Sequence, residues 1–178
     1  MLWLDIKEFI KDALKYIVTA IIVILIFLYV LSMQQIIGPS MSPTLTDGDL
    51  VLLDKISLRF TDIKRNQIVS INYADTKYLI KRVVGLPGEY VESKNNVLYV
   101  DGTANKETFL GDDVVTEDFS IKDLGYDKIP DDMYLVLGDN RSNSKDSRDP
   151  DVGLIKKEDI IGKVFFQFWP LNEISFVK

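Results

Sequence analysis

One serine of this sequence has the setting of a nucleophile. The stretch QQIIGPSMSPTLTDGD, from Gln34 to Asp49, directly follows a long apolar run and contains Ser40 in the order Gly-Pro-Ser-Met-Ser-Pro. A serine hydroxyl is a weak nucleophile until a neighbouring base removes its proton, and that base is usually histidine. The chain contains no histidine, so the base would have to be a carboxylate or a neutral lysine amine. Gly-Pro-Ser is also a common turn sequence, so Ser40 alone does not establish catalysis.

Lys81 is the lysine with the most unusual surroundings. It lies in YLIKRVVGLPGE, where strand alternation places it on one face with Leu79 and Val83. Apolar surroundings lower the pKa of an amine, because burial disfavours the charged form. A lysine of pKa ~10.4 is almost wholly protonated at pH 7, and a shift of about 3 units would make it roughly half neutral. The alternative is that Lys81 extends its ammonium group to solvent at a strand edge, and the pattern alone leaves both interpretations open.

The composition excludes several classes of function. The 178 residues carry a formal net charge of -6, which argues against a surface that binds nucleic acid. Cysteine and histidine are absent, so disulfides, thiol chemistry and the usual zinc sites are excluded. A carboxylate site for Mg²⁺ or Ca²⁺ is possible in principle, but no EF-hand spacing occurs. We therefore expect no metal and no cofactor.

Residues 16–35 are expected to form a transmembrane anchor. The run YIVTAIIVILIFLYVLSM, from Tyr16 to Met33, is uncharged, and as a helix it would span about 27 Å, close to the ~30 Å hydrocarbon core of a bilayer. A cleaved signal peptide has a shorter apolar core of about 7 to 15 residues. A buried core helix is rarely apolar on every face over such a length. We therefore prefer a retained anchor to both alternatives.

The charges that flank the run predict its orientation. Lys7, Lys11 and Lys15 precede it, and the next basic residue is Lys55. The positive-inside rule therefore places the leader, residues 1–15, in the cytoplasm and the rest of the chain outside. The leader itself is either a short helix in the membrane interface or simply the first turns of the anchor helix.

Residues 36–178 are expected to form one extracytoplasmic, mainly β domain. Short runs rich in aliphatic and aromatic residues, separated by turn sequences, are typical of an antiparallel sheet. The runs are DLVLLD, QIVSINY, YLIKRVVG, NVLYVDG, MYLVLGD and KVFFQFWP. The segment of about 103–132 is acidic and weakly patterned, and we interpret it as a loop excursion from the β core that has room for a small extra hairpin.

Four sequence blocks carry a resemblance to a known family. The blocks GPSMSPTL, GDLVLLDK, IKRVVGLPGE and GDNRSNSKDSRDPDVGLI occur in that order. Together with the anchor they resemble the type I signal peptidases of bacteria, in the single-anchor form typical of Gram-positive organisms. The likeness runs from Ile37 through Trp169 and weakens only across the acidic excursion. It implies a transmembrane helix followed by an antiparallel β-sheet catalytic domain with a signal-peptidase-like fold, acting as a serine endopeptidase.

The resemblance also assigns roles to individual residues. Ser40 falls on the family's nucleophile, Lys81 on its general base, and Ser144 on the residue whose hydroxyl orients the lysine amine. The block from Gly138 to Arg148, by resemblance, supports the site, although without the resemblance an acidic surface loop rich in turn residues would be the better interpretation. The supporting ion pairs that the resemblance implies are Arg82 with Asp139 and Asp146 with Arg148.

One position departs from part of the family. Some members have a serine two residues before the nucleophile, and its hydroxyl helps the backbone N–H of the nucleophile to bind the oxyanion. This chain has Gly38 there. Losing one oxyanion donor costs ~3 to 4 kcal/mol, so we expect the Ser40 N–H to be retained and a backbone group or water near Gly38 to replace the hydroxyl.

The resemblance further implies the substrates and the place of action. The partners would be secreted preproteins with small residues, typically Ala, at the first and third positions before the cut, and the lipid bilayer, with cleavage at the outer face of the cytoplasmic membrane. From the sequence alone, each residue of the implied substrate pockets could equally well be an ordinary core residue. These residues are Ile36, Met41, Leu45, Leu79 and Ile80.

Two other functions stay open at this point. The first is a related Ser-Lys protease that cleaves itself, although such autoproteases are soluble whereas this chain carries an apolar run. The second is a non-catalytic β scaffold held at the membrane. A scaffold would need no lysine at position 81, and the lysine is present.

Overall fold

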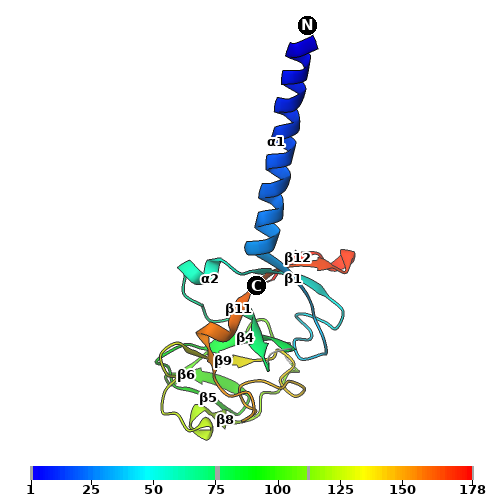
Figure 1. Cartoon of the computed structure of the whole chain (residues 1–178). Coiled ribbons are helices and arrows are strands. Elements are labelled where there is room, and N and C mark those ends of the chain that lie inside the picture. The colour runs from blue at the N-terminus through cyan, green and yellow to red at the C-terminus, as the bar shows by residue number, and fades with distance from the viewer. Residues whose placement is uncertain (1, 75–76, 112, 178) are drawn as a thin grey trace.

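A long helix followed by a β domain makes up the protein (Figure 1). The computed structural model describes residues 2–74, 77–111 and 113–177. Helix α1 (Leu2–Tyr29) projects from the domain and runs through the leader and into the apolar run without a break, so the leader belongs to the same helix. Among the described residues, no helix combines the length and the apolar character that crossing a membrane requires.

The predicted helical range of residues 16–35 is wrong at its C-terminal end. Helix α1 ends at Tyr29, and β1 (Leu31–Gln35) is a strand that pairs antiparallel with β2 (Leu50–Asp54). The apolar run continues to Met33, so hydropathy alone does not mark this boundary. The strand forms because β2 satisfies its backbone hydrogen bonds, and β2 lies later in the sequence.

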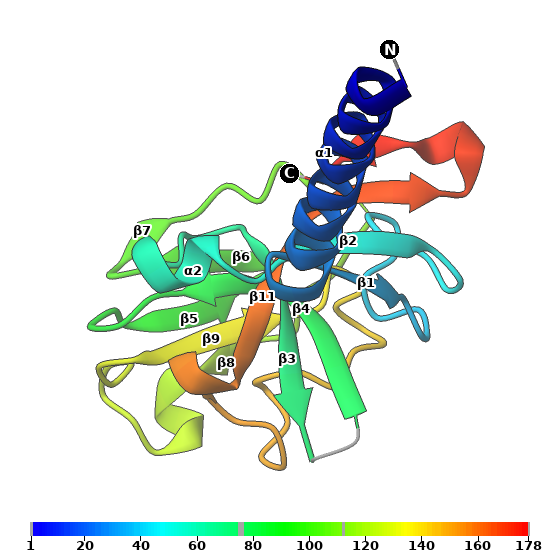
Figure 2. The same ribbon diagram turned by 45° about the horizontal axis from the view of Figure 1, so that its top comes forward.

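The main sheet positions the site. Its described strands follow the order β1-β2-β11-β3-β4-β9-β10, with β12 paired to β11, and all of these pairings are antiparallel (Figure 2). The central strands β2, β11, β3, β4 and β9 all overlap runs predicted as strands. Its further strands are β3 (Ile68–Tyr73), β4 (Lys77–Gly85), β9 (Met133–Leu137), β10 (Ile155–Lys156), β11 (Ile160–Trp169) and β12 (Ser175–Phe176).

A second, smaller sheet uses the acidic excursion. Its described strands are ordered β7-β6-β5-β8, and the excursion of about 103–132 supplies the two outer ones. The excursion is therefore part of the folded domain rather than only a loop. The strands are β5 (Val91–Lys94), β6 (Val97–Val100), β7 (Thr103–Ala104) and β8 (Phe119–Ser120); the short helices are α2 (Ser57–Phe60), η1 (Ile121–Leu124), η2 (Lys157–Asp159) and η3 (Leu171–Glu173).

Strand β4 carries two charged residues into the interior. It lies between β3 and β9, and residues 80–85 are all buried. Ile80, Val83 and Val84 belong to three different apolar clusters of the core. Lys81 and Arg82 follow Ile80 directly, with exposed fractions of only 2% and 0%. Buried charges of this kind require partners, and those partners define the site.

Candidate active site

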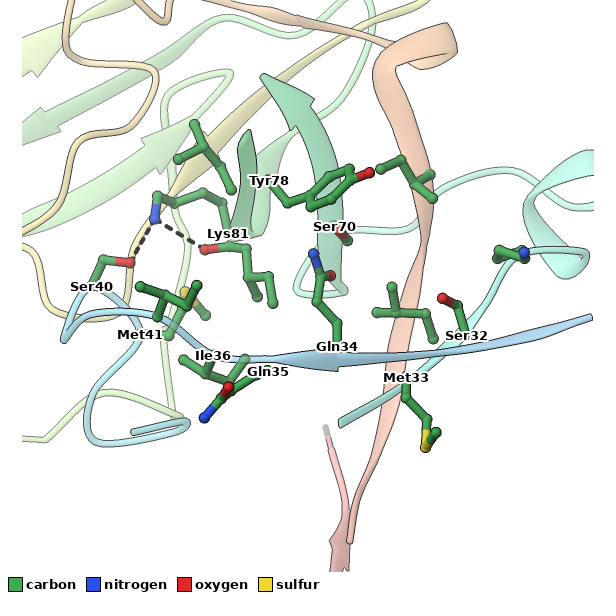
Figure 3. Close-up of a pocket in the computed structure, with 16 residues that line it drawn as sticks. Ser32, Met33, Gln34, Gln35, Ile36, Ser40, Met41, Ser70, Tyr78 and Lys81 are labelled. Carbon is green, nitrogen blue, oxygen red and sulfur yellow. Dashed lines mark hydrogen bonds between the residues drawn. The ribbon is translucent and has the colours of Figure 1, made fainter. Parts of the chain in front are cut away.

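Ser40 and Lys81 meet in the folded protein. Ser40 lies in the loop between β1 and β2, and Lys81 comes from β4. The Lys81 Nζ lies 2.6 Å from the Ser40 Oγ and 3.0 Å from the Ile80 carbonyl oxygen (Figure 3). The distance from amine to hydroxyl is that of a hydrogen bond, as a base and its nucleophile require.

Contacts on both sides of Ser40 fix its loop. Gly38 has φ +84, a left-handed conformation that favours glycine, and its N–H donates to Asp47 Oδ1 at 2.7 Å. The backbone N–H of Asn140 donates to the Ser40 carbonyl at 3.0 Å, and the Asn140 side-chain amide donates to the Pro39 carbonyl at 3.1 Å. The backbone of the nucleophile candidate is therefore held at two successive peptide groups.

Burial changes the acidity of Lys81. Desolvation lowers the pKa of its amine from 10.5 to about 8, against the charges of Asp146 and Asp139, which raise it. With that pKa, about a tenth of the amine is neutral at pH 7. A neutral fraction of this size is large enough for a general base, whereas an ordinary exposed lysine has almost none.

Each of the two carboxylates is paired with an arginine. Arg82 Nε donates to Asp139 Oδ1 at 2.9 Å and Arg82 Nη2 to Asp139 Oδ2 at 2.7 Å, with both side chains fully buried. Arg148 binds Asp146 with the same forked geometry: its Nε donates to Oδ1 at 2.9 Å and its Nη2 donates to Oδ2 at 2.8 Å. Burial alone would raise the pKa of Asp146, but the hydrogen bond and charge of Arg148 lower it overall. Both ion pairs inferred from the sequence are thus present.

The acidic excursion adds contacts that the sequence did not reveal. Arg141, which is 2% exposed, donates to both carboxylate oxygens of Glu107, at 2.9 and 2.5 Å, and to the Thr116 hydroxyl at 2.8 Å. The Phe109 ring lies 3.9 Å from the guanidinium carbon of Arg82. Glu107, Phe109 and Thr116 lie in a segment without clear periodicity, so no sequence pattern signalled a role for them.

Ser144 is not placed as expected. Its buried hydroxyl lies beside Asp146 and helps to lower the pKa of that carboxyl, whereas the second contact of the Lys81 amine is the Ile80 carbonyl. Gly138 lies between Ser144 and the backbone of Ser40, because a Cβ added there would overlap both the Ser144 Oγ and the Ser40 carbonyl oxygen. The close approach of these segments therefore requires glycine, and Ser144 stays beside the site without orienting the amine.

Of the two backbone groups considered as oxyanion donors, the structure leaves the Ser40 N–H available but not the Gly38 N–H. The Ser40 N–H makes no hydrogen bond within the described part of the chain, so it is available to a developing oxyanion. The Gly38 N–H is already donated to Asp47, so this particular backbone group does not replace the missing hydroxyl.

A cleft of about 780 Å³ opens beside the Ser40–Lys81 pair. Four of the five residues expected in the substrate pockets line it: Ile36, Met41, Leu79 and Ile80. Leu45 does not, because it is fully buried in the core cluster that also contains Met41. Among the described residues, no group of acidic side chains is arranged to hold a metal ion.

Comparisons with known proteins place this geometry in a family. The model of the family "Signal peptidase, peptidase S26" matches residues 7–169. Signal peptidase IB of Staphylococcus aureus (strain MRSA252) is 36% identical over 182 aligned positions, which cover 96% of this chain and 94% of that protein. Signal peptidase I of Bacillus amyloliquefaciens is also 36% identical, with 97% and 95% covered.

A solved structure is similar as well. The crystal structure of a signal peptidase I from Enterococcus faecalis V583 superposes with a TM-score of 0.51 and 30% sequence identity, covering 58% of this chain and 97% of that one. It supports a signal-peptidase-like, mainly antiparallel β fold. With a family model that spans most of its length and relatives aligned almost end to end, this chain belongs to the signal peptidase family, peptidase S26, and is a serine peptidase.

Proposed function

We propose that this signal peptidase removes signal peptides from secreted preproteins by means of a Ser40–Lys81 dyad. The observation that carries the proposal is the 2.6 Å contact between the Ser40 Oγ and a buried amine of lowered pKa. In a chain without histidine, no other base with a pKa near neutrality lies within hydrogen-bond reach of this hydroxyl among the described residues.

The geometry supports a two-step acyl transfer. The Ser40 hydroxyl donates its proton to the neutral Lys81 amine as Oγ attacks the scissile carbonyl carbon, and the Ser40 N–H stabilises the oxyanion. The resulting ammonium gives its proton to the departing amine, which leaves an ester on Ser40. Lys81, neutral again, then takes a proton from the water that hydrolyses the ester, and finally returns a proton to Ser40. Asp146 and Asp139 stabilise the transient ammonium, since their charges raise the Lys81 pKa.

We further propose that α1 anchors the protein in the cytoplasmic membrane, with the β domain on the outer face. Along α1 the apolar side chains from Tyr16 to Ile26 are largely exposed, with values between 42% and 78% for the large ones. The described domain offers them no cover, and helix α1 extends away from it (Figure 1). A lipid environment would bury this surface, and the lysines of the leader favour the cytoplasmic side.

The cleft supports small residues next to the cut. Ile36, Met41 and Ile80 are buried side chains that line it beside Ser40. An apolar lining next to Ser40 suits a small apolar side chain at the scissile bond, which fits preproteins with Ala at that position.

The deciding experiment compares variants on a purified preprotein in detergent. Ser40→Ala should abolish cleavage, whereas Ser42→Ala, in the same loop, should cleave at the wild-type rate. Cleavage of the added preprotein, rather than of the enzyme itself, separates this function from self-cleavage. Equal rates for wild type and Ser40→Ala would rule out Ser40 as the nucleophile.

A further inference from the structure

Two unpaired oxygens lie in the wall of the catalytic cleft. The Gln34 Oε1 and the Ser70 Oγ are both buried without a hydrogen-bond partner among the described residues, and both residues line the cleft that contains Ser40 and Lys81. Ser70 is 0% exposed. Buried polar atoms in native proteins are normally paired, because leaving one unpaired costs free energy. No protein group among the described residues pairs with them, so a molecule bound in the cleft can supply the missing partners.

Strand geometry places these oxygens at a definite distance from the cut. Gln34 precedes Ile36 by two residues on the same side of the chain, and its side chain points towards Ser70 and Tyr78 (Figure 3). Two residues of an extended strand span about 6.8 Å. On the opposite wall, Ser70 of β3 pairs with Ile80 of β4, so their side chains share one face of the sheet. Gln34 and Ser70 thus lie two strand residues beyond the part of the cleft that is lined by Ile36.

A bound peptide has the same repeat. An extended substrate with its first residue before the cut beside Ser40 and Ile36 places its third residue about 6.8 Å away on the same side. That third side chain then faces Gln34 and Ser70. Apart from Lys81, the cleft near Ser40 is lined by the apolar side chains of Ile36, Met41 and Ile80, so the selectivity at the third residue should differ in kind from that at the first.

We propose that Gln34 and Ser70 form a polar subsite that selects a hydroxyl-bearing residue, Ser or Thr, as the third residue before the cut. The substrate hydroxyl donates to the Gln34 Oε1 and accepts a hydrogen bond from the Ser70 hydroxyl. This inference rests on the proposed function and goes beyond a general requirement for small side chains, because it distinguishes Thr from Val, which have nearly the same shape.

The test uses the full-length enzyme in detergent and peptides that span a signal-peptide cleavage site. The peptides carry Ala as the first residue before the cut and Thr, Val, Ser or Ala as the third. For the wild type we expect kcat/KM to be about tenfold higher for Thr than for Val, and higher for Ser than for Ala, because the apolar residue leaves both oxygens unpaired.

Variants assign the preference to the two side chains. In the double variant Gln34→Met with Ser70→Ala, the Thr-to-Val ratio should fall to about one or below. Gln35→Met is the matched control, because Gln35 points away from Ser70 in Figure 3, and it should keep the wild-type ratio. Ser70→Ala alone removes one oxygen from the core and should give an intermediate ratio, which keeps the test informative if the double variant is unstable.

The outcomes separate the two proposals. If no peptide is cleaved in a Ser40-dependent manner, the proposed function fails. If the Ala peptide is cleaved but wild-type enzyme treats Thr and Val alike, the polar subsite is wrong and the oxygens are satisfied by water. A Thr preference that survives in the double variant would equally refute the assignment to Gln34 and Ser70.

Discussion

The peptidase activity should rise about tenfold between pH 7 and pH 9, because only the neutral form of Lys81 can accept the Ser40 proton. With a pKa of about 8 for the Lys81 amine, the neutral fraction is about 0.09 at pH 7, about 0.5 at pH 8 and about 0.9 at pH 9. The pH profile of kcat/KM reports the ionisation of the free enzyme. It should therefore show a limb with a midpoint near 8, well above the value that a histidine base would give.

Lys81→Arg tests whether proton transfer, rather than charge or packing, is the role of this side chain. A guanidinium retains a positive charge and much of the aliphatic stem but does not lose its proton in proteins. Lys81→Arg should therefore be as inactive as Ser40→Ala at every pH from 7 to 9.

The assay measures cleavage of one purified preprotein across this range, with Lys94→Arg as the control. Lys94 is exposed and lies on the smaller sheet, so its variant should reproduce the wild-type limb. Near-normal turnover by Lys81→Arg, or a wild-type profile that is flat between pH 7 and pH 9, would show that the base lies elsewhere.

Further predictions concern stability, tuning and topology. The Lys81 amine releases its proton near pH 8 in the folded protein and near 10.5 when unfolded, so the free energy of unfolding of the wild type should rise with pH through this window. At pH 7 the Lys81→Met variant should be about 2 kcal/mol more stable than the wild type, after the lost hydrogen bond is subtracted. Urea titration at pH 7 and pH 10 measures both effects. Asp139→Asn should lower the free energy of unfolding by ~3 to 5 kcal/mol, since it removes the carboxylate that compensates the buried charge of Arg82, and a small shift in the urea midpoint would contradict this. Arg148→Met should move the activity limb to higher pH, because an unpaired Asp146 attracts the Lys81 ammonium more strongly; a limb that stays at pH 8 would argue against this tuning. Protease added outside sealed, right-side-out vesicles should digest the β domain and spare the leader, and labelling of the leader from outside would overturn the proposed orientation.

Short-range pattern predicted much of the domain. The central strands β2, β3, β4, β9 and β11 follow from runs of aliphatic residues between turn sequences, because a pleated strand buries alternate side chains. The end of helix α1 did not follow from the sequence, since the apolar run passes through Tyr29 into β1 without a change in hydropathy. The pairing with β2 is a tertiary interaction, and hydropathy carries no information about it.

The site shows the same division between local and long-range information. The family resemblance carried by the motifs around Ser40 and Lys81 implied that they meet, and the structure places them in contact. The partners of Arg141 and Arg82 in the excursion were missed, because Glu107 and Phe109 gain their roles only when that segment folds against the sheet. Ser144 was assigned by resemblance to the Lys81 amine, and in the structure its hydroxyl acts on Asp146 while the amine contacts the Ile80 carbonyl.

The surroundings of Lys81 have to tolerate both forms of its amine, neutral before the attack and charged after it. Burial favours the neutral form, whereas the carboxylates Asp146 and Asp139 favour the charged form. A single unpaired carboxylate ~5 Å from an amine is worth about 3 kcal/mol at an effective dielectric constant of about 20, which is about 2.4 pKa units and would by itself restore an ordinary lysine pKa. Burial keeps the pKa near 8 although both carboxylates raise it, and each carboxylate is itself engaged in a forked ion pair, Asp146 with Arg148 and Asp139 with Arg82. The excursion packs against this arrangement through Phe109, which lies over the Arg82 guanidinium, so a segment with little sequence pattern contacts the surroundings of the proposed base.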